Sequence, residues 1–598
     1  MILDFFNSPY NARHLEPKEV AERFIWSENF EKLIQNNHSV ILGARGCGKT
    51  TLMKMLTIPA LQAWKNDKRA EIIRKNIPFY GVYISTDIYW DVKNQTYSKQ
   101  LEKIPKLSER ISSFSVNSNV FKALCNTFLN VINTEIKDND ESKEHQLCLE
   151  LIKAWKLKPT IPRLVYIKES IDERIDEVNQ LIQDLIFNFS KDQKLTLPSY
   201  FNLAFESSIE RIIPIFERIY KIQDNSKKWA LCFDELEFAP LWLQEKLFTS
   251  LRSRKQYILY KLSSSPILTE DLLHTFKSDF GPTSGNDVEL IKMWDFKDSE
   301  EFSDRIIKTY LGLENDPIDV FGSNPVYSKL ANSYETGSDF HDKIIGLAEK
   351  DDSFKKFLQN KKVDVNNISF TNSKEKNELY RKIKPIVYHR EFFIEKNSFV
   401  NGVKYRSRKK YYELYSGIEV ITKICDGNPR WLITIINQMR LKLKDGKIAK
   451  SDQFDELFKA SKRFLNVMAN IPVGKSVVTL SKLIERVGES FKNQILGKNF
   501  LMDPCGTFKV DTEEDLLDED IVRILYKGVS QGAFILLDYN DDTFDFELRG
   551  KRFKLSYLFF ILYNLPLRNY TAMYLSDALK DIKDSDNFNQ GTLFKTEI

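Results

Sequence analysis

The chain has 598 residues, of which 42% are hydrophobic and 29% charged, and its formal net charge is +4. This length exceeds what one hydrophobic core serves and predicts about three to four domains. The composition excludes a disordered chain, and the small net charge neither supports nor excludes binding to nucleic acid.

Residues 43–51 follow a short apolar strand at 38–42 and precede a helical pattern. They satisfy G-x-x-x-x-G-K-[ST] at every fixed position, in the strand, loop and helix context that a phosphate-binding loop requires. Backbone N–H groups can surround a phosphate, Lys49 can reach its β and γ oxygens, and Thr50 can hold Mg²⁺. We therefore predict a nucleoside triphosphate site formed by Gly43, Ala44, Arg45, Gly46, Cys47, Gly48, Lys49, Thr50 and Thr51.

Two aromatic residues precede this loop, in a helix that Pro17 can start. Phe24 or Trp26 could stack on the nucleotide base, because segments before a phosphate-loop strand often cover it. Ordinary packing of both rings in the core is the interpretation we favour.

A second strand is expected at 77–86, and residues 88–228 then read as helical almost throughout. Within them, Ile171, Ile175, Val178, Ile182 and Leu185 form a heptad seam. The seam is compatible with a short coiled coil formed with a partner, but it spans only two heptads, which is short for a coiled coil. We favour a helix packed in an internal bundle.

Residues 229–235 form an apolar strand that ends in adjacent carboxylates. Opposite a phosphate loop, Asp234 can hold the Mg²⁺ shell and Glu235 can orient and activate the attacking water. A further strand at 257–262 ends in Ser263, Ser264 and Ser265, where a serine either hydrogen-bonds the γ-phosphate or the water, or simply forms a turn. With a strand at 288–294, five strands separated by helical connections predict an α/β parallel sheet.

The region 313–412 is polar and weakly helical, and its basic run at 404–410 fits either a phosphate-backbone contact or, as we favour, a solvated face. A helix at 413–424 then stops at a glycine turn, after which Pro429 and Arg430 start a second helix. The tail, 464–598, shows helices near 477–487 and 518–530 and a hairpin of 533–539 with 543–548. This order predicts a winged-helix-like module with Arg549, Lys551, Arg552 and Lys554 at the hairpin exit.

The six cysteines are scattered, without a C-x-x-C pair or a histidine cluster nearby. Their spacing indicates neither a zinc site nor a disulfide framework and favours a reducing compartment. The first residues lack a basic segment followed by an apolar core, and the apolar run at 557–567 is too short to span a bilayer. We expect a cytoplasmic protein without a membrane partner.

The stretches GARGCGKT, CFDE, a strand ending in SSS, and GNPR between two helices together resemble the AAA+ ATPases. NARHL ahead of the loop and GNPRWL are similar to prokaryotic proteins grouped with origin-recognition-type initiators and to STAND signalling ATPases. The resemblance covers about 1–90, 225–310 and 413–445, and it implies ATP as the nucleotide, an α/β domain and a helical lid. It also implies that Arg430 reaches the γ-phosphate and that Pro429 lies near the base.

The sequence departs from typical AAA+ rings because residues 266–304 contain no arginine that could act on a neighbour's ATP. Arg252 and Arg254, on the preceding helix, are the candidates for this role on a neighbour's ATP. The sequence therefore leaves open whether the chain forms a homo-oligomer. The expected domains are an ATPase domain at 1–310 with an insertion at 88–228, a lid at 311–463 with an insertion at 313–412, and the module at 464–598.

The leading hypothesis is an ATP-hydrolysing AAA+ switch that acts on a protein or nucleic-acid partner. It is compatible with a bacterial anti-phage defence or signalling system whose effector is encoded separately, because the chain shows no nuclease, protease or deaminase constellation. The alternative is a replication-initiator-like ATPase that binds DNA through the tail.

Overall fold

The computed structural model describes residues 12–91, 107–137, 140–188, 197–223, 226–252, 257–268, 287–294, 299–312, 316–328, 334–368, 373–406, 412–471, 478–513, 516–538 and 548–580, with single residues at 272, 282 and 285. They form two compact units. The first contains residues 12–43 and 48–293, and the second contains 44–47 and the later part of the chain. Within the described residues, none of the helices is long and apolar enough to cross a membrane.

The first unit is built on a five-stranded parallel sheet with the order β2-β3-β4-β1-β5. Its strands are β1 (His38–Leu42), β2 (Phe79–Ser85), β3 (Lys228–Asp234), β4 (Ile258–Ser264) and β5 (Val288–Lys292). The strands are largely buried, as the continuous apolar runs predict for a parallel sheet covered on both faces. The predicted α/β fold is confirmed, and β4 lies between the phosphate-loop strand β1 and the acidic strand β3.

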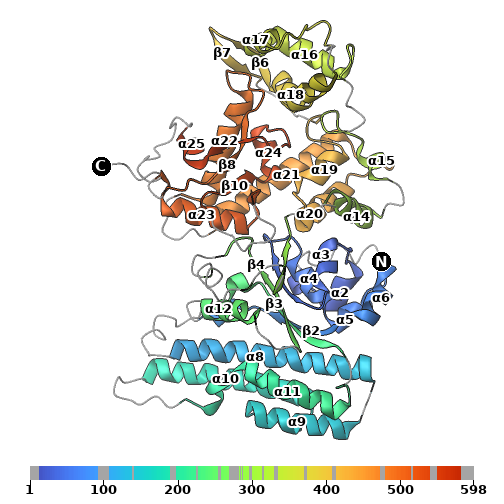
Figure 1. Cartoon of the computed structure of the whole chain (residues 1–598), viewed down its shortest axis with the longest axis vertical. Coiled ribbons are helices and arrows are strands. Elements are labelled where there is room, and N and C mark those ends of the chain that lie inside the picture. Colours follow the sequence, from blue (N-terminus) through green and yellow to red (C-terminus); the bar gives the residue numbers. More distant parts are fainter. Residues whose placement is uncertain are drawn as a thin grey trace. The chain divides into compact units, whose positions relative to one another are not determined.

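Short helices pack around this sheet (Figure 1). The segment before β1 contributes η1 (Ala12–His14), α2 (Pro17–Glu22) and α3 (Glu28–Leu33). After β1 come α4 (Lys49–Met55), α5 (Ile58–Ala63) and α6 (Arg69–Asn76), and η2 (Ile88–Trp90) follows β2. η6 (Leu236–Phe238) and α12 (Leu241–Ser250) follow β3.

The expected helical insertion between β2 and β3 is a bundle of helices (Figure 1). Its elements are α8 (Leu107–Asn130), a π-helical turn η4 (Val131–Ile136), α9 (Glu141–Trp155), α10 (Leu164–Asn188), η5 (Ser199–Asn202) and α11 (Phe205–Tyr220). The heptad seam lies on α10, where Val178 and Ile182 join a buried cluster with Leu107, Ile111 and Phe114 of α8. The seam therefore packs inside the bundle, as we favoured, rather than facing a partner.

The second unit begins with a helical region. It comprises α14 (Ser299–Leu311), α15 (Pro317–Phe321), α19 (Ile418–Ile424), α20 (Pro429–Arg440) and α21 (Lys450–Ala469). α19 starts five residues later than the predicted start at residue 413. Gly417 adopts φ 93°, and the side-chain amide of Asn324 donates to the carbonyls of Glu413 and Ser416, which fixes this stretch as an irregular loop.

An insertion between α15 and α19 forms a small subdomain of three helices and a hairpin. Its elements are α16 (Asp339–Lys350), α17 (Asp352–Asn360), α18 (Ser373–Phe393), β6 (Ile394–Ser398) and β7 (Gly402–Tyr405). The basic run begins in β7, where Lys404 pairs with Glu395 and the Tyr405 hydroxyl donates to the carbonyl of Leu496. Residues 407–410 of that run lie outside the described residues.

The C-terminal module combines α22 (Leu480–Leu496), α23 (Glu519–Ser530), α24 (Tyr557–Tyr563) and α25 (Leu575–Lys580) with a four-stranded sheet. The strands β8 (Cys505–Lys509), β9 (Phe534–Leu536), β10 (Arg552–Leu555) and β11 (Thr571–Tyr574) have the order β11-β8-β10-β9. Helix α23 leads into the antiparallel pair β9 and β10, which is the winged-helix-like arrangement. The predicted return strand at 543–548 falls almost wholly outside the described residues, and the described partner of β9 is β10.

Candidate active site

The phosphate-loop motif connects β1 to α4, as predicted. Gly46 and Gly48 adopt φ of 88° and 102°, a left-handed conformation that side-chain-bearing residues rarely take. The N–H of Gly43 donates to the carbonyl of Ser264, 3.1 Å away, which ties the loop to the end of β4. Thr50 and Thr51 lie in the first turn of α4, so the positive end of the helix dipole faces the loop.

Lys49 is the first residue of α4 and is buried. Its ammonium donates to the Gly43 carbonyl at 2.5 Å and lies 3.5 Å from the carboxylate of Glu237. Glu237 was not predicted as a site residue, although it lies only two residues beyond Glu235. Through this ion pair the loop after β1 and the acidic turn after β3 share one site.

Asp234 ends β3 and its carboxylate is held by three donors. The Ser263 hydroxyl and the Glu235 N–H donate to Oδ1 at 2.6 and 3.1 Å, and the Tyr83 hydroxyl donates to Oδ2 at 3.1 Å. Burial and the Asp234 charge raise the pKa of Tyr83 far above its usual value, so the phenol stays a neutral donor. The carboxylate is thus fixed in one orientation at the carboxyl edge of the sheet.

Glu235 follows directly with φ 57°, an uncommon backbone conformation for a residue other than glycine. Its N–H donates to the Ser263 hydroxyl oxygen as well, at 3.0 Å. Oε2 lies 3.4 Å from the Arg13 guanidinium, yet this buried oxygen accepts no hydrogen bond from the described residues. Burial, with Asp234 as the next cause, raises the pKa of Glu235.

The serines at the end of β4 differ in their contacts, and a hydrogen bond from one of them to the γ-phosphate or the attacking water stays a prediction. Ser263 contacts both members of the acidic pair. The Ser265 hydroxyl donates to the carbonyl of Ile267 at 2.6 Å and so stabilises the turn after the strand. Ser263 is therefore the serine that belongs to the site.

The segment before α2 also reaches the site. The Lys54 ammonium donates to the carbonyls of Arg13 and Leu15 at 3.1 and 2.6 Å, and this anchors η1. Arg13 in turn donates to the carbonyl of Thr86 at the end of β2 and pairs with Glu235. Arg13 lies within the NARHL stretch, and no role at the site was predicted for it.

Phe24 and Trp26 pack in an aromatic cluster with Phe30 and Trp64. Phe24 is buried, and the ring of Trp26 stacks on Trp64 with the Arg69 guanidinium over its face at 4.8 Å. The favoured interpretation as a core aromatic is confirmed for Phe24, whereas Trp26 packs in the same cluster but is only half-buried.

The remaining site candidates lie elsewhere in the chain. Pro429 and Arg430 are the first residues of α20 in the second unit, capped by the Asn428 side chain, and their part in the nucleotide site stays a prediction. Arg252 lies just beyond the end of α12, and Arg254 lies outside the described residues.

The chain matches the family model described as ORC-CDC6-like over residues 6–575. Comparison with curated proteins gives no match, and neither does comparison with solved structures.

Proposed function

The chain belongs to the ORC-CDC6-like family, and from this membership and the geometry of the site we propose that it binds ATP with Mg²⁺ and hydrolyses the ATP. In this proposal it is an AAA+ switch whose nucleotide state controls its action on a protein or nucleic-acid partner. A defence or signalling system with a separately encoded effector is one setting for such a switch.

The observation that carries the proposal is the 3.5 Å contact between the Lys49 ammonium and the Glu237 carboxylate. It links the phosphate loop to the turn that carries Asp234 and Glu235, so the groups for phosphate binding and for water activation occur together. The Glu237 carboxylate is the anion that pairs with the Lys49 ammonium in this structure. A phosphate of ATP would take the place of this carboxylate. Because the γ-phosphate carries up to two negative charges and a carboxylate only one, the exchange with the γ-phosphate is favourable.

In this proposal each group of the site has its own role in ATP binding and hydrolysis. Backbone N–H groups of the loop and Lys49 bind the β- and γ-phosphates, and Thr50 with Asp234 would hold Mg²⁺, which supplies charge neutralisation at the phosphates. Glu235 accepts a proton from the attacking water. Its raised pKa makes it a better proton acceptor than an ordinary glutamate, provided that the pH keeps it ionised.

Ser263 aligns the two carboxylates, because its hydroxyl joins Asp234 Oδ1 to the backbone N–H of Glu235. In the AAA+ lid model, Arg430 adds a positive charge at the γ-phosphate. Loss of that phosphate on hydrolysis would release Arg430, which is how chemistry at the site would move the lid.

Two variants test this function. Lys49→Ala should abolish binding of a fluorescent ATP analogue, because the central phosphate ligand is lost. Glu235→Gln should keep binding and lose phosphate release, because the amide cannot accept the proton. Normal ATP turnover by the Glu235→Gln protein would overturn the assignment.

DNA binding is a second candidate, favoured by the winged-helix-like order of the C-terminal module. Several of the predicted cations already have partners in the second unit. Lys554 is buried and pairs with Asp426 at 2.7 Å, and Arg552 donates to Thr507 and to the Tyr570 carbonyl. Arg549 also donates, to the carbonyls of Asp511 and Glu513 at 3.5 and 3.4 Å, and we neutralise it together with Lys551 in the test.

The DNA hypothesis predicts affinity that falls steeply with salt and weakens in an Arg549→Ala, Lys551→Ala protein. No binding of duplex DNA at low salt would remove it. ATPase activity measured with and without DNA, together with the mass of the protein in ATP, separates an initiator-like activity from a switch that acts on protein.

A further inference from the structure

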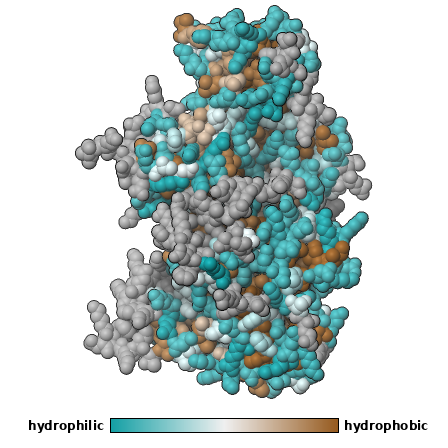
Figure 2. All heavy atoms as spheres, viewed as in Figure 1, coloured by the Kyte–Doolittle hydropathy of each residue, from teal (hydrophilic) through white to brown (hydrophobic). Residues whose placement is uncertain are grey.

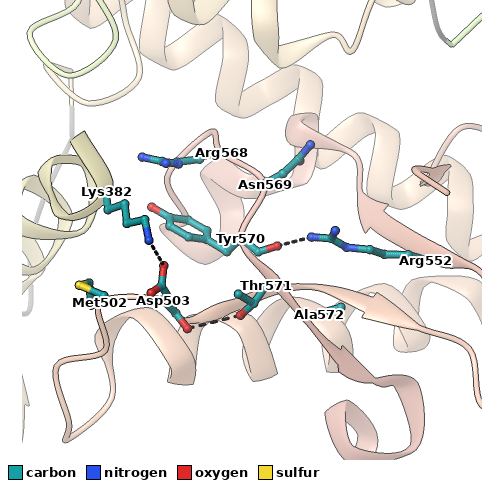
Figure 3. Close-up of a pocket in the computed structure, with 9 residues that line it drawn as sticks. All are labelled: Lys382, Met502, Asp503, Arg552, Arg568, Asn569, Tyr570, Thr571 and Ala572. Atoms are coloured by element: carbon teal, nitrogen blue, oxygen red, sulfur yellow. Dashed lines mark hydrogen bonds and ion pairs between the residues drawn. The ribbon is translucent and has the colours of Figure 1, made fainter. Parts of the chain in front are cut away.

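The second unit contains a cavity of about 390 Å³ that the proposed ATPase site does not use. Its walls come from α18, which carries Lys382, from β10, which carries Arg552, and from the segments around Asp503 and 568–572 (Figure 3). This volume lies within the usual range for small-molecule sites.

The lining is strongly basic. Lys382, Arg552 and Arg568 contribute three positive charges against one carboxylate, Asp503. Lys382 lies 3.7 Å from that carboxylate, and the hydrogen bonds of Arg552 and Arg568 to Thr507, Tyr570 and Arg381 occupy only some of their five N–H donors each. The cavity therefore keeps an excess of positive charge and of hydrogen-bond donors.

Tyr570 supplies a second, independent feature. Its hydroxyl oxygen is buried and has no hydrogen-bond partner among the described residues. Figure 3 shows the phenol end directed to the side of the cavity where Lys382 and Arg568 lie. An unpaired buried hydroxyl is unfavourable, and a ligand oxygen that accepts from it would remove that cost.

The walls are held in place before any ligand binds. The guanidinium of Arg390, on the same helix as Lys382, donates to the carbonyls of Ile495 and Gly497 at 2.8 and 2.9 Å and pairs with the fully buried Asp351. Arg568 also donates to the carbonyl of Arg381, beside Lys382. Little ordering is then needed on binding.

We propose that this cavity binds a small phosphorylated ligand that also carries hydroxyl groups, the chemistry of a sugar phosphate or a mononucleotide. Lys382, Arg568 and Arg552 bind the phosphate dianion, with the Tyr570 hydroxyl as a further donor. Asp503 accepts hydrogen bonds from the ligand hydroxyls. The same carboxylate would repel a continuous phosphate backbone, which favours a small ligand over DNA.

The test uses the full-length Lys49→Ala protein, so that the phosphate loop does not contribute. Isothermal titration with ribose 5-phosphate should show one site per chain, inorganic phosphate should bind more weakly, and ribose should not bind. Tyr570→Phe removes only the hydroxyl and should weaken ribose 5-phosphate binding about 3- to 10-fold. Arg568→Gln should weaken it further.

Lys527→Ala is the matched control, because Lys527 is an exposed cation of the same module and does not line the cavity. It should leave the ribose 5-phosphate affinity unchanged. Absence of binding at millimolar ribose 5-phosphate and at millimolar AMP overturns the proposal. So does binding that Tyr570→Phe and Arg568→Gln leave intact, or loss of DNA binding in these two variants without any sugar-phosphate binding. None of these results bears on ATP hydrolysis, which Glu235→Gln tests separately.

Discussion

The guanidinium of Arg13 lies 3.4 Å from the carboxylate of Glu235, and the same arginine donates to the carbonyl of Thr86. Arg13 precedes the phosphate loop and Glu235 belongs to the acidic strand end, so this pair joins the beginning of the described chain to the proposed catalytic residue. The positive charge lowers the pKa of Glu235, whereas burial and Asp234 raise it.

Arg13→Ala should therefore shift the acid limb of the pH profile for ATP turnover to higher pH. Glu235 must be ionised to accept a proton, so turnover falls as the pH drops through its pKa, and removal of Arg13 raises that pKa further. We expect a shift of up to about one pH unit, because the arginine is partly exposed to solvent. The measurement is the phosphate-release rate at saturating ATP between pH 5 and 8 (about the range in which a raised carboxyl pKa acts).

Lys18→Ala is the control for this shift, because Lys18 is an exposed cation of the neighbouring helix α2. It should leave the pH profile in place. Identical acid limbs in the Arg13→Ala and unmodified proteins would show that the pair does not influence the ionisation of Glu235 during turnover.

Ser263→Ala should reduce ATP turnover about 10- to 100-fold with little change in ATP affinity. The substitution removes the donor to Asp234 Oδ1 and the acceptor for the Glu235 N–H, so the two carboxylates lose their common alignment. Ser264→Ala, at the next position of the same strand, is the matched control. Equal losses in both variants would indicate general damage to β4 rather than a positioning role for Ser263.

The phosphate loop and the strands of the first sheet could be predicted because their signals are local. Gly43 to Thr50 form one continuous motif, and buried parallel strands appear as uninterrupted apolar runs. The structure of the insertion in the second unit was harder to predict. Its hairpin β6–β7 went unpredicted although Asn401-Gly402 is a turn signal, because the surrounding residues are mostly polar and helical in pattern.

The contacts that orient the site could not be predicted from spacing. Tyr83 and Asp234 are 151 positions apart, and only the pairing of β2 with β3 brings them together. Arg13 and Glu235 meet in the same way, through tertiary packing of η1 that Lys54 anchors. The sequence motifs therefore predict which residues form the site, whereas the strand order decides which residues hold them in place.

Lys261 should make the stability of the first unit depend on pH. Its ammonium is fully buried in β4, donates to the carbonyls of Gln35 and Asn37 at 2.9 and 2.7 Å, and has its pKa lowered by burial from 10.5 to about 7. Between these values the unfolded chain binds more protons than the folded one, so the free energy of unfolding should rise with pH. Denaturant unfolding between pH 7 and 9.5 (about the lower part of that window) measures the slope.

Lys261→Met keeps the apolar stem and removes the titrating group. The variant should be less stable overall, because two backbone carbonyls lose their donor, and its unfolding free energy should rise less with pH. A slope equal to that of the unmodified protein would show that Lys261 keeps an ordinary pKa in the folded state.

The buried pair of Arg390 and Asp351 should contribute far more to stability than an exposed ion pair in the same subdomain. Both side chains are fully buried, and Asp351 also accepts from Asn397 and Ser353. Asp351→Ala leaves the guanidinium buried without its counter-charge and should cost about 3–5 kcal/mol. Glu395→Ala breaks only the exposed contact with Lys404 and should cost less than about 1 kcal/mol.

Denaturant unfolding of the two variants compares these losses of stability. Similar losses would mean that water reaches Arg390 once Asp351 is removed. Because Arg390 fixes α18 against the end of α22, Asp351→Ala should also weaken ribose 5-phosphate binding at the cavity, whereas Glu395→Ala should not.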